Sequence, residues 1–179
     1  NPIDLEELAV GTEPPPALDP AESFPYVPAF ATEADATVKA PAWLNDVTLY
    51  HNRGNSTFEG ESSTLGDFFG LDDLFTEHPR VVEGWIELTE DILRRFPIDG
   101  FRVDTVKHVN DEFWPQWTSA VTAATAGEDF LVFGEVFSED PIFNSRYTTA
   151  LGFPSLLDFG FNGAATRFMA SCGASRFVA

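Results

Sequence analysis

Apolar residues in the middle of the chain recur at two different spacings. From residue 79 onward they recur every three or four positions, which is the period of an amphipathic helix. They are Val81, Trp85, Leu88, Ile92 and Phe96. Pro79 suits the first turn of such a helix, and Pro97 followed by Asp99 and Gly100 ends it. The same spacing predicts a second helix from Asp111 to Ala126, with Asp111 as its N-cap.

Two short apolar runs flank the second predicted helix. The first opens the stretch Ile98 to Asn110 (IDGFRVDTVKHVN), and the second is Phe130 to Phe137 (FLVFGEVF). Helix, strand, helix and strand in this order indicate consecutive β/α units, in which neighbouring strands are parallel. After a weakly helical stretch to Ala150, Ser155 to Phe161 (SLLDFGF) predicts one more strand. The predicted fold class is therefore α/β.

Regular patterning is weak in the first part of the chain. Prolines are dense as far as Pro41, and proline disfavours both helix interiors and central strands. Residues 1–41 therefore predict irregular surface structure or a disordered tail, with Asp4 to Val10 as one or two helical turns. A brief alternation at Val47 and Leu49 predicts a short hairpin strand followed by a turn.

Composition excludes several classes of protein. The 179 residues, of which 44% are hydrophobic, are enough to bury a core. A net charge of −19 argues against a surface for nucleic acid or anionic membranes, although it says nothing about a neutral sugar. The single cysteine, Cys172, excludes an internal disulfide and a cysteine-rich metal site. No apolar run approaches the roughly 18 residues that a membrane span requires, so we expect neither nucleic acid nor membrane as a partner.

Charged side chains gather where both predicted strands end. Side chains alternate along a strand, so Arg102 and Asp104 project on one face while Phe101 and Val103 project on the other. An arginine beside Asp104 lowers the pKa of that carboxyl group and keeps it ionised, which suits a nucleophile or an electrostatic stabiliser. Glu135 follows Asp104 by 31 positions (135 − 104), about the length of one strand–helix–strand unit. Both carboxylates are therefore expected at the same rim of the sheet.

Two carboxylates at one rim, one paired with a cation and one among apolar neighbours, are the arrangement used for retaining glycoside hydrolysis. The ionised group attacks the anomeric carbon, and the other protonates the leaving oxygen. Taken singly, each carboxylate is more simply a solvated loop residue. Their combination favours the catalytic interpretation.

The residues around both carboxylates resemble those of a known family. GFRVDTVKH closely resembles the second conserved region of the α-amylase family (glycoside hydrolase family 13), and FGEV resembles its third. The resemblance implies that Asp104 is the catalytic nucleophile, Glu135 the general acid/base, and Arg102 the arginine that orients the nucleophile. It also implies substrate-binding roles for Lys107 and His108, which match positions bordering the aglycone side.

The resemblance extends to the fold and to a metal. Residues 71–74 (LDDL) are similar to the family's LPDL segment, where the barrel resumes after an inserted domain. This implies a loop-rich, domain-B-like insertion over residues 1–65 and the central strands and helices of a (β/α)8 TIM barrel over residues 66–179. Asp73 falls on an aspartate that is often a calcium ligand, so Asp73 and the backbone carbonyl of His108 are the implied ligands of a calcium ion.

The sequence also departs from the family pattern. Asp46 and His51 have the spacing of the first conserved region, but Tyr50 replaces its asparagine, so we interpret this match as accidental and His51 as a loop residue near the cleft. The N-H-D motif that carries the third carboxylate is absent from the 179 residues. A complete barrel needs about 250 residues. We therefore expect an internal or processed piece, without a signal peptide, that needs the remainder of the barrel for activity.

Three functions fit these observations. The first is a retaining hydrolase of α-linked oligosaccharides or polysaccharides such as starch, from a parent protein that is extracellular. The second is a transglycosylase or a sucrose-active relative, since hydrolysis and transfer differ only in what resolves the glycosyl-enzyme intermediate. The third is a non-catalytic fragment that only folds or binds carbohydrate.

Overall fold

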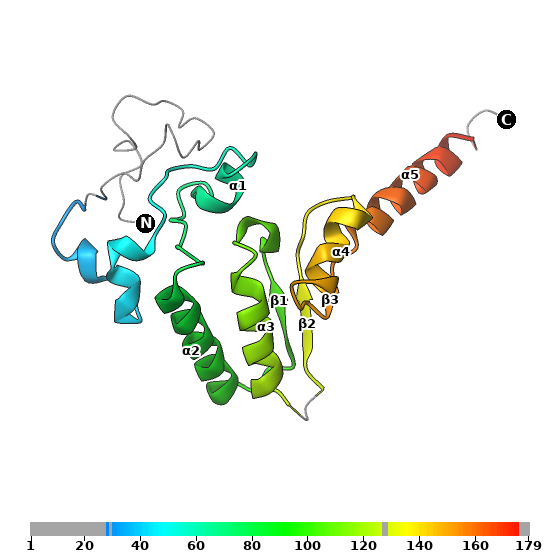
Figure 1. Cartoon of the computed structure of the whole chain (residues 1–179). Helices are drawn as coiled ribbons and strands as arrows, with labels where there is room; N and C mark the ends of the chain where they lie inside the picture. The colour runs from blue at the N-terminus through cyan, green and yellow to red at the C-terminus, as the bar shows by residue number, and fades with distance from the viewer. Residues whose placement is uncertain (1–27, 29, 127–128, 176–179) are drawn as a thin grey trace.

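The computed structural model describes residues 28, 30–126 and 129–175 (Figure 1). Three short strands form a parallel sheet in the order β1 (Gly100–Val103), β2 (Leu131–Gly134) and β3 (Ser155–Leu156). The longer helices are α2 (Pro79–Arg95), α3 (Phe113–Ala124), α4 (Pro141–Thr149) and α5 (Phe159–Ser175). Helices α2, α3 and α4 precede β1, β2 and β3 in turn. The predicted β/α order is therefore confirmed.

The part before α2 consists of short helical turns and loops. They are the 3₁₀ turns Asp35–Thr37, Ala42–Asn45 and Val47–Leu49 and the four-residue helix α1 (Ser62–Leu65). The prediction of a hairpin strand at Val47 and Leu49 is wrong, because these residues form a 3₁₀ turn. The Asp46 carboxylate accepts hydrogen bonds from the backbone N–H and the hydroxyl of Thr48, at 3.0 and 2.6 Å, and such local side-chain bonds favour a turn over a strand ladder. The helical turns predicted at Asp4 to Val10 lie outside the described residues.

Helix α2 begins and ends where the sequence predicts. Pro79 occupies the first turn, and the His78 imidazole caps the helix by accepting the N–H of Arg80 at 3.1 Å. Helices α2 and α3 lie side by side (Figure 1), and the Trp117 indole of α3 donates to the Thr89 hydroxyl of α2 at 2.9 Å. The pair of helices thus covers one face of β1 and β2.

The main core lies between α3 and the sheet. Its buried members include Phe113, Trp114, Trp117, Val121 and Val132. The first three are neighbours in a cluster of edge-on rings. Burial of several large aromatic side chains contributes strongly to stability, because each removes a large apolar area from water. This core covers one face of the strands, so Arg102, which alternates with Phe101 and Val103 along β1, lies on the opposite face.

Two predictions at element ends need correction. Asp111 is not the N-cap of α3, because its carboxylate pairs with the Arg146 guanidinium of α4, while Glu112 holds the cap position without a side-chain bond. The strand predicted over Ser155 to Phe161 is confined to β3. Phe159 instead begins α5, where the Asp158 carboxylate accepts the N–H of Phe161 at 2.7 Å.

Helix α5 extends away from the sheet (Figure 1). Within the described residues, no helix is long and apolar enough to cross a lipid bilayer.

Candidate active site

Strands β1 and β2 bring two carboxyl groups to one rim. Their register pairs Val103 with Gly134, so the residues that follow, Asp104 and Glu135, leave adjacent strands at the same end. The Glu135 N–H donates to the Val103 carbonyl at 2.8 Å, and the Val106 N–H donates to the Glu135 carbonyl at 3.0 Å. These bonds extend the ladder past the strand ends and hold both residues in position.

Arg102 contacts both carboxyl groups. Its Nη1 lies 2.7 Å from Asp104 Oδ1, and its Nη2 lies 3.2 Å from Glu135 Oε2. A hydrogen bond from Glu135, together with the Arg102 guanidinium, holds the pKa of Asp104 below its ordinary value. The Asp104 side chain is 63% exposed and that of Glu135 22%. Asp104 is therefore an ionised group open to a ligand, and Glu135 is the more enclosed of the two.

Thr105 has an unusual backbone conformation directly after Asp104. Its φ and ψ of 50° and 32° lie in the left-handed region, which β-branched residues rarely adopt. This conformation directs the Thr105 N–H toward Glu135 Oε2, at 3.4 Å, and begins the 3₁₀ turn Val106–His108. Backbone strain of this kind is typical of functional sites. Nothing in the sequence pattern signals it.

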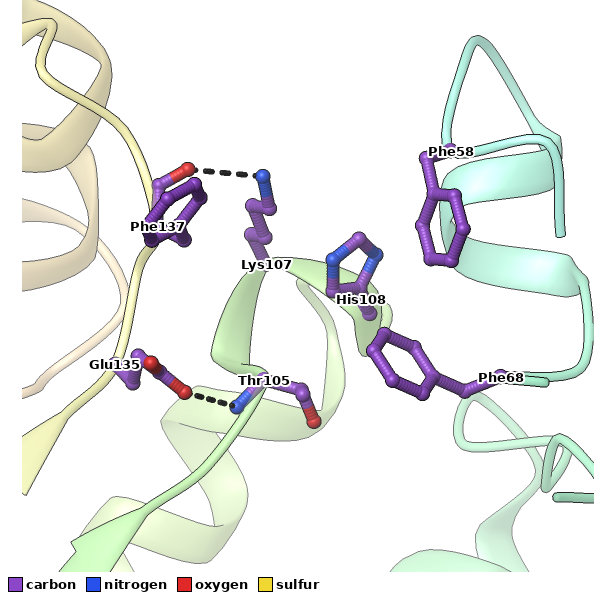
Figure 2. Close-up of a pocket in the computed structure, with 7 residues that line it drawn as sticks. All are labelled: Phe58, Phe68, Thr105, Lys107, His108, Glu135 and Phe137. Atoms are coloured by element: carbon purple, nitrogen blue, oxygen red, sulfur yellow. Dashed lines mark hydrogen bonds between the residues drawn. The ribbon is translucent and has the colours of Figure 1, made fainter.

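A pocket of about 340 Å³ opens beside Glu135. Its lining consists of Phe58, Phe68, Thr105, Lys107, His108, Glu135 and Phe137 (Figure 2). Phe58 comes from the loop before α1, and Phe137 from the loop after β2. Apolar walls with a few polar groups are typical of sites for small organic ligands. The sequence analysis missed these three phenylalanines as site residues, because aromatic residues are more often core.

Lys107 and His108 border the same pocket. The Lys107 ammonium donates to the Phe137 carbonyl at 2.9 Å. His108 Nδ1 lies 2.9 Å from the Ser63 carbonyl, and its ring contacts those of Phe58 and Phe68 at 5.5 and 5.6 Å between centroids. Burial lowers the pKa of His108, so its imidazole is neutral at pH 7 and can donate from Nδ1. The structure thus gathers all five residues predicted around the chemistry: Arg102, Asp104, Lys107, His108 and Glu135.

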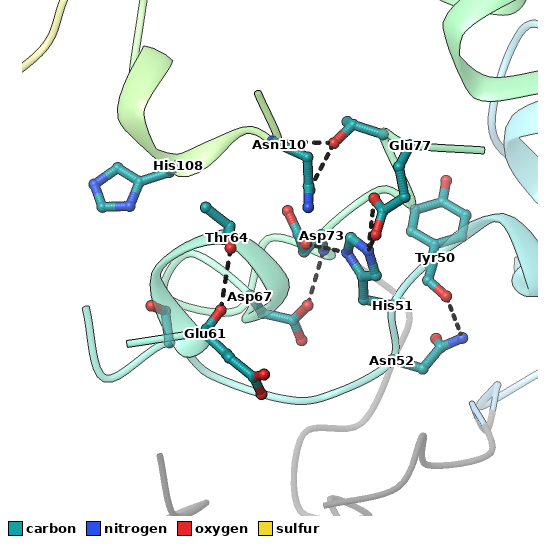
Figure 3. A network of polar contacts seen from close by, with 12 residues as sticks. Tyr50, His51, Asn52, Glu61, Thr64, Asp67, Asp73, Glu77, His108 and Asn110 are labelled. Atoms are coloured by element: carbon teal, nitrogen blue, oxygen red, sulfur yellow. Dashed lines mark hydrogen bonds and ion pairs between the residues drawn. The ribbon is translucent and has the colours of Figure 1, made fainter. Parts of the chain in front are cut away.

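Asp73, the other predicted site residue, lies in a buried charge cluster (Figure 3). His51 Nδ1 lies 2.5 Å from Asp73 Oδ2, and His51 Nε2 lies 3.1 Å from the Glu77 carboxylate. Burial by itself would lower the pKa of His51, but the two carboxylates raise it to about 9. Burial raises the pKa of Asp73 to about 6. At pH 7 a histidinium therefore lies between two carboxylates.

These contacts bear on the expected calcium ion. One Asp73 oxygen is occupied by His51, and the buried carboxylate of Asp67 accepts the Asp73 N–H at 2.8 Å. Among the residues that the structure describes, no group of three or more His, Cys, Asp or Glu side chains could hold a metal. Calcium prefers about six to eight oxygen ligands, so this donor set does not form a calcium site by itself. Asp73 and the His108 carbonyl as ligands stay predictions.

Comparison with known proteins gives a consistent result. The family model described as "Alpha amylase, catalytic domain" matches residues 27–178. An α-amylase from Streptomyces lividans is 46% identical over 182 aligned residues, which cover 100% of this chain and 20% of the relative. The chain therefore spans a fifth of the length of that relative.

Two solved structures share the fold. An α-amylase from Anoxybacillus has a TM-score of 0.62 and 32% identity, with 70% of this chain and 28% of that chain covered. An α-amylase from Geobacillus thermoleovorans, solved in complex with acarbose, has a TM-score of 0.60 and 31% identity, with 68% and 28% covered. The likeness thus includes most of the chain described above.

Proposed function

Because this chain belongs to the α-amylase family and is part of its TIM-barrel catalytic domain, we propose that it supplies the nucleophile and the general acid/base of a retaining hydrolase of α-linked glucans. The observation that carries the proposal is the shared contact of Arg102 with the carboxylates of Asp104 and Glu135, at 2.7 and 3.2 Å. Adjacent parallel strands hold these groups at one rim, where a single glycosidic bond can reach both.

Each carboxyl group has a distinct part in the chemistry. The ionised Asp104 attacks the anomeric carbon and forms a glycosyl ester, while Glu135 gives its proton to the departing oxygen. Glu135 then takes a proton from water, and that water releases the sugar from Asp104. One guanidinium contacts both groups, with Arg102 Nη1 2.7 Å from Asp104 Oδ1 and Arg102 Nη2 3.2 Å from Glu135 Oε2. Two carboxylates that share one guanidinium lie close together, which supports the separation of about 5–5.5 Å in retaining enzymes over the 6.5–9.5 Å of inverting enzymes.

The pocket beside Glu135 is our proposed site for the sugar on the leaving-group side. A proton donor has to face the leaving oxygen, so the ring attached to that oxygen enters the space next to Glu135. Lys107 and His108 border this space, and the rings of Phe58 and Phe137 provide apolar walls. Transfer to a second sugar, in place of water, is the second candidate function, since an acceptor sugar held in the same pocket would exclude water from the ester.

A complete barrel has to supply the remaining strands and the third carboxylate, because this chain spans 20% of its Streptomyces lividans relative. Residues 1–65 as an insertion and residues 66–179 as barrel units are part of the proposal. The short turns over residues 30–65 and the β/α alternation from α2 onward support this division. We further propose that the complete protein is extracellular and acts on starch-like glucans, and the acidic composition suits such a medium.

Glu135→Gln tests the proposed acid/base in a complete barrel that carries this chain, for example in place of the matching segment of the Streptomyces lividans enzyme. We expect kcat/KM for maltohexaose to fall by about 10²–10⁴-fold. The loss should be far smaller for a dinitrophenyl maltoside, because its leaving group needs no protonation. Glu139→Gln is the matched control, since Glu139 lies in the same loop but pairs with Arg167 at 2.7 Å. Equal losses on both substrates would contradict an acid role.

Arg102→Met tests the proposed orientation and charging of the nucleophile. The pKa of Asp104 is lowered by its hydrogen bond with Glu135 and by Arg102, and the ionised form is the one that attacks. Removing the guanidinium raises this pKa, so the acid limb of kcat/KM against pH is expected to move to higher pH. Arg94→Met on the exposed side of α2 should leave the limb in place. A lower rate with an unmoved acid limb would show that Arg102 does not control this ionisation.

A further inference from the structure

Phe137 is an apolar side chain in an exposed position at the rim. It follows Glu135 by two residues and is 66% exposed, although exposure of a large aromatic ring to water is unfavourable. Its ring packs edge-on against Phe159 at the start of α5, with 4.8 Å between centroids. The same ring also lines the pocket beside Glu135 (Figure 2). The position of this ring therefore determines the shape of the proposed leaving-group site.

Backbone carbonyls at three residues of the loop that carries Phe137 accept hydrogen bonds from neighbouring segments. The Glu135 carbonyl accepts the Val106 N–H at 3.0 Å. The Phe137 carbonyl accepts from the Lys107 ammonium at 2.9 Å. The Ser138 carbonyl accepts from the Asn144 amide of α4 at 2.8 Å. Of these three hydrogen bonds, only the one to the Phe137 carbonyl has a charged donor, and Phe137 is the residue whose ring lines the pocket.

Lys107 lies in a position from which its ammonium can hold the Phe137 carbonyl. It lies in the 3₁₀ turn Val106–His108, which the hydrogen bond from the Val106 N–H to the Glu135 carbonyl fixes relative to β2. Its ammonium also lies over the Phe137 ring, 5.7 Å from the centroid. The same cation thus contacts both the backbone and the ring of Phe137. A hydrogen bond from a charged donor is stronger than one between neutral groups, so this contact can hold Phe137, which is exposed although its neighbour Val136 is buried in the core.

We infer that Lys107 is a positioning residue for the leaving-group site, which acts by fixing Phe137 as the wall against which a sugar ring binds. This inference rests on the proposed function and deepens it. It differs from direct sugar contact by Lys107, because the effect of the lysine on a bound sugar passes through the Phe137 ring. Removing the ring should therefore remove the effect of the lysine.

A double-mutant cycle tests this dependence in the complete barrel, with Lys107→Met, Phe137→Ala and the double variant. We expect Lys107→Met to raise KM for maltohexaose about tenfold, the effect of losing one hydrogen bond from a charged group. In the Phe137→Ala background, the same change is expected to alter KM by less than about twofold. Lys107→Arg keeps a donor in reach of the carbonyl and should restore most of the loss. KM for α-maltosyl fluoride should rise much less, since fluoride does not fill the pocket.

Two results would overturn the inference. One is a Lys107→Met effect of the same size with and without the Phe137 ring, which would show direct contact with the sugar. The other is an equal effect on maltohexaose and α-maltosyl fluoride, which would show a general structural role. Turnover of α-maltosyl fluoride by the parent barrel tests the proposed function separately. If that turnover is absent, calorimetric titration of the four proteins with maltohexaose measures the same coupling in affinity, and absence of coupling overturns the inference.

Discussion

Replacing Asp104 by asparagine is expected to lower kcat/KM by on the order of 10⁴-fold or more, as is typical when a covalent nucleophile is lost. The amide oxygen still accepts from Arg102, so the rim keeps its geometry, but the amide cannot form the glycosyl ester. Turnover of α-maltosyl fluoride and of maltohexaose by the complete barrel measures the loss. Both substrates should be affected, because attack on the anomeric carbon precedes every product.

Covalent trapping identifies the nucleophile directly. A fluorinated glucosyl donor slows release of the ester, and peptide mass spectrometry then locates the label on the peptide that contains Asp104. Asp99→Asn is the control, since Asp99 is an exposed residue at the opposite end of β1 and its variant should label and turn over normally. Label on another carboxylate, or activity retained after Asp104→Asn, would refute the assignment.

Replacing His51 by alanine is expected to lower the free energy of unfolding by about 3 kcal/mol, because removal of one partner leaves the charges of a buried pair uncompensated. The His51 side chain is only 7% exposed and lies between the carboxylates of Asp73 and Glu77. Urea unfolding of the same barrel measures the change. Adding Asp73→Asn and Glu77→Gln to His51→Ala should recover part of the loss, since those changes remove the unpaired charges.

The control for this experiment is an ion pair on the surface. Arg80 and Glu83 lie 3.2 Å apart with both side chains substantially exposed, and exposed pairs of this kind contribute about 0–1 kcal/mol. Glu83→Ala should therefore change the unfolding free energy by less than His51→Ala. Equal effects of the two substitutions would mean that the buried contacts of His51 contribute no more to the free energy of unfolding than an exposed ion pair does.

The cluster of His51, Asp73 and Glu77 is linked by a hydrogen bond to the loop that borders the pocket beside Glu135. Thr76, beside Glu77, accepts the backbone N–H of Asn110 at 3.3 Å, and Asn110 lies two residues after His108. We therefore expect a loss of order around His51 to reach the loop that borders the pocket. The sequence analysis interpreted His51 as a loop residue near the cleft. The structure places it in a loop, and shows in addition that it is buried and bonded to two carboxylates.

Local periodicity was sufficient to predict the parts of the site that lie on regular elements. Alternation along a strand places Arg102 and Asp104 on one face, and the length of one β/α unit places Glu135 in register beside Asp104. Both arguments use only residues near in sequence and the fixed geometry of strands. For the same reason α2, with its regular apolar spacing and Pro79, was predicted close to its observed bounds.

Only the tertiary structure decided which distant side chains meet. Phe58 and Phe137 are far apart in sequence and line one pocket, His51 pairs with Asp73 and Glu77, and Lys107 bonds to the carbonyl of Phe137. No spacing rule connects such residues, because their contact depends on how loops fold over a packed core. The sequence alone determined the β/α frame and the position of Asp104 beside Glu135 at the ends of adjacent strands, since both follow from backbone geometry. The residues that line the pocket and the contacts that hold them in place depend on packing, which is set by the whole fold.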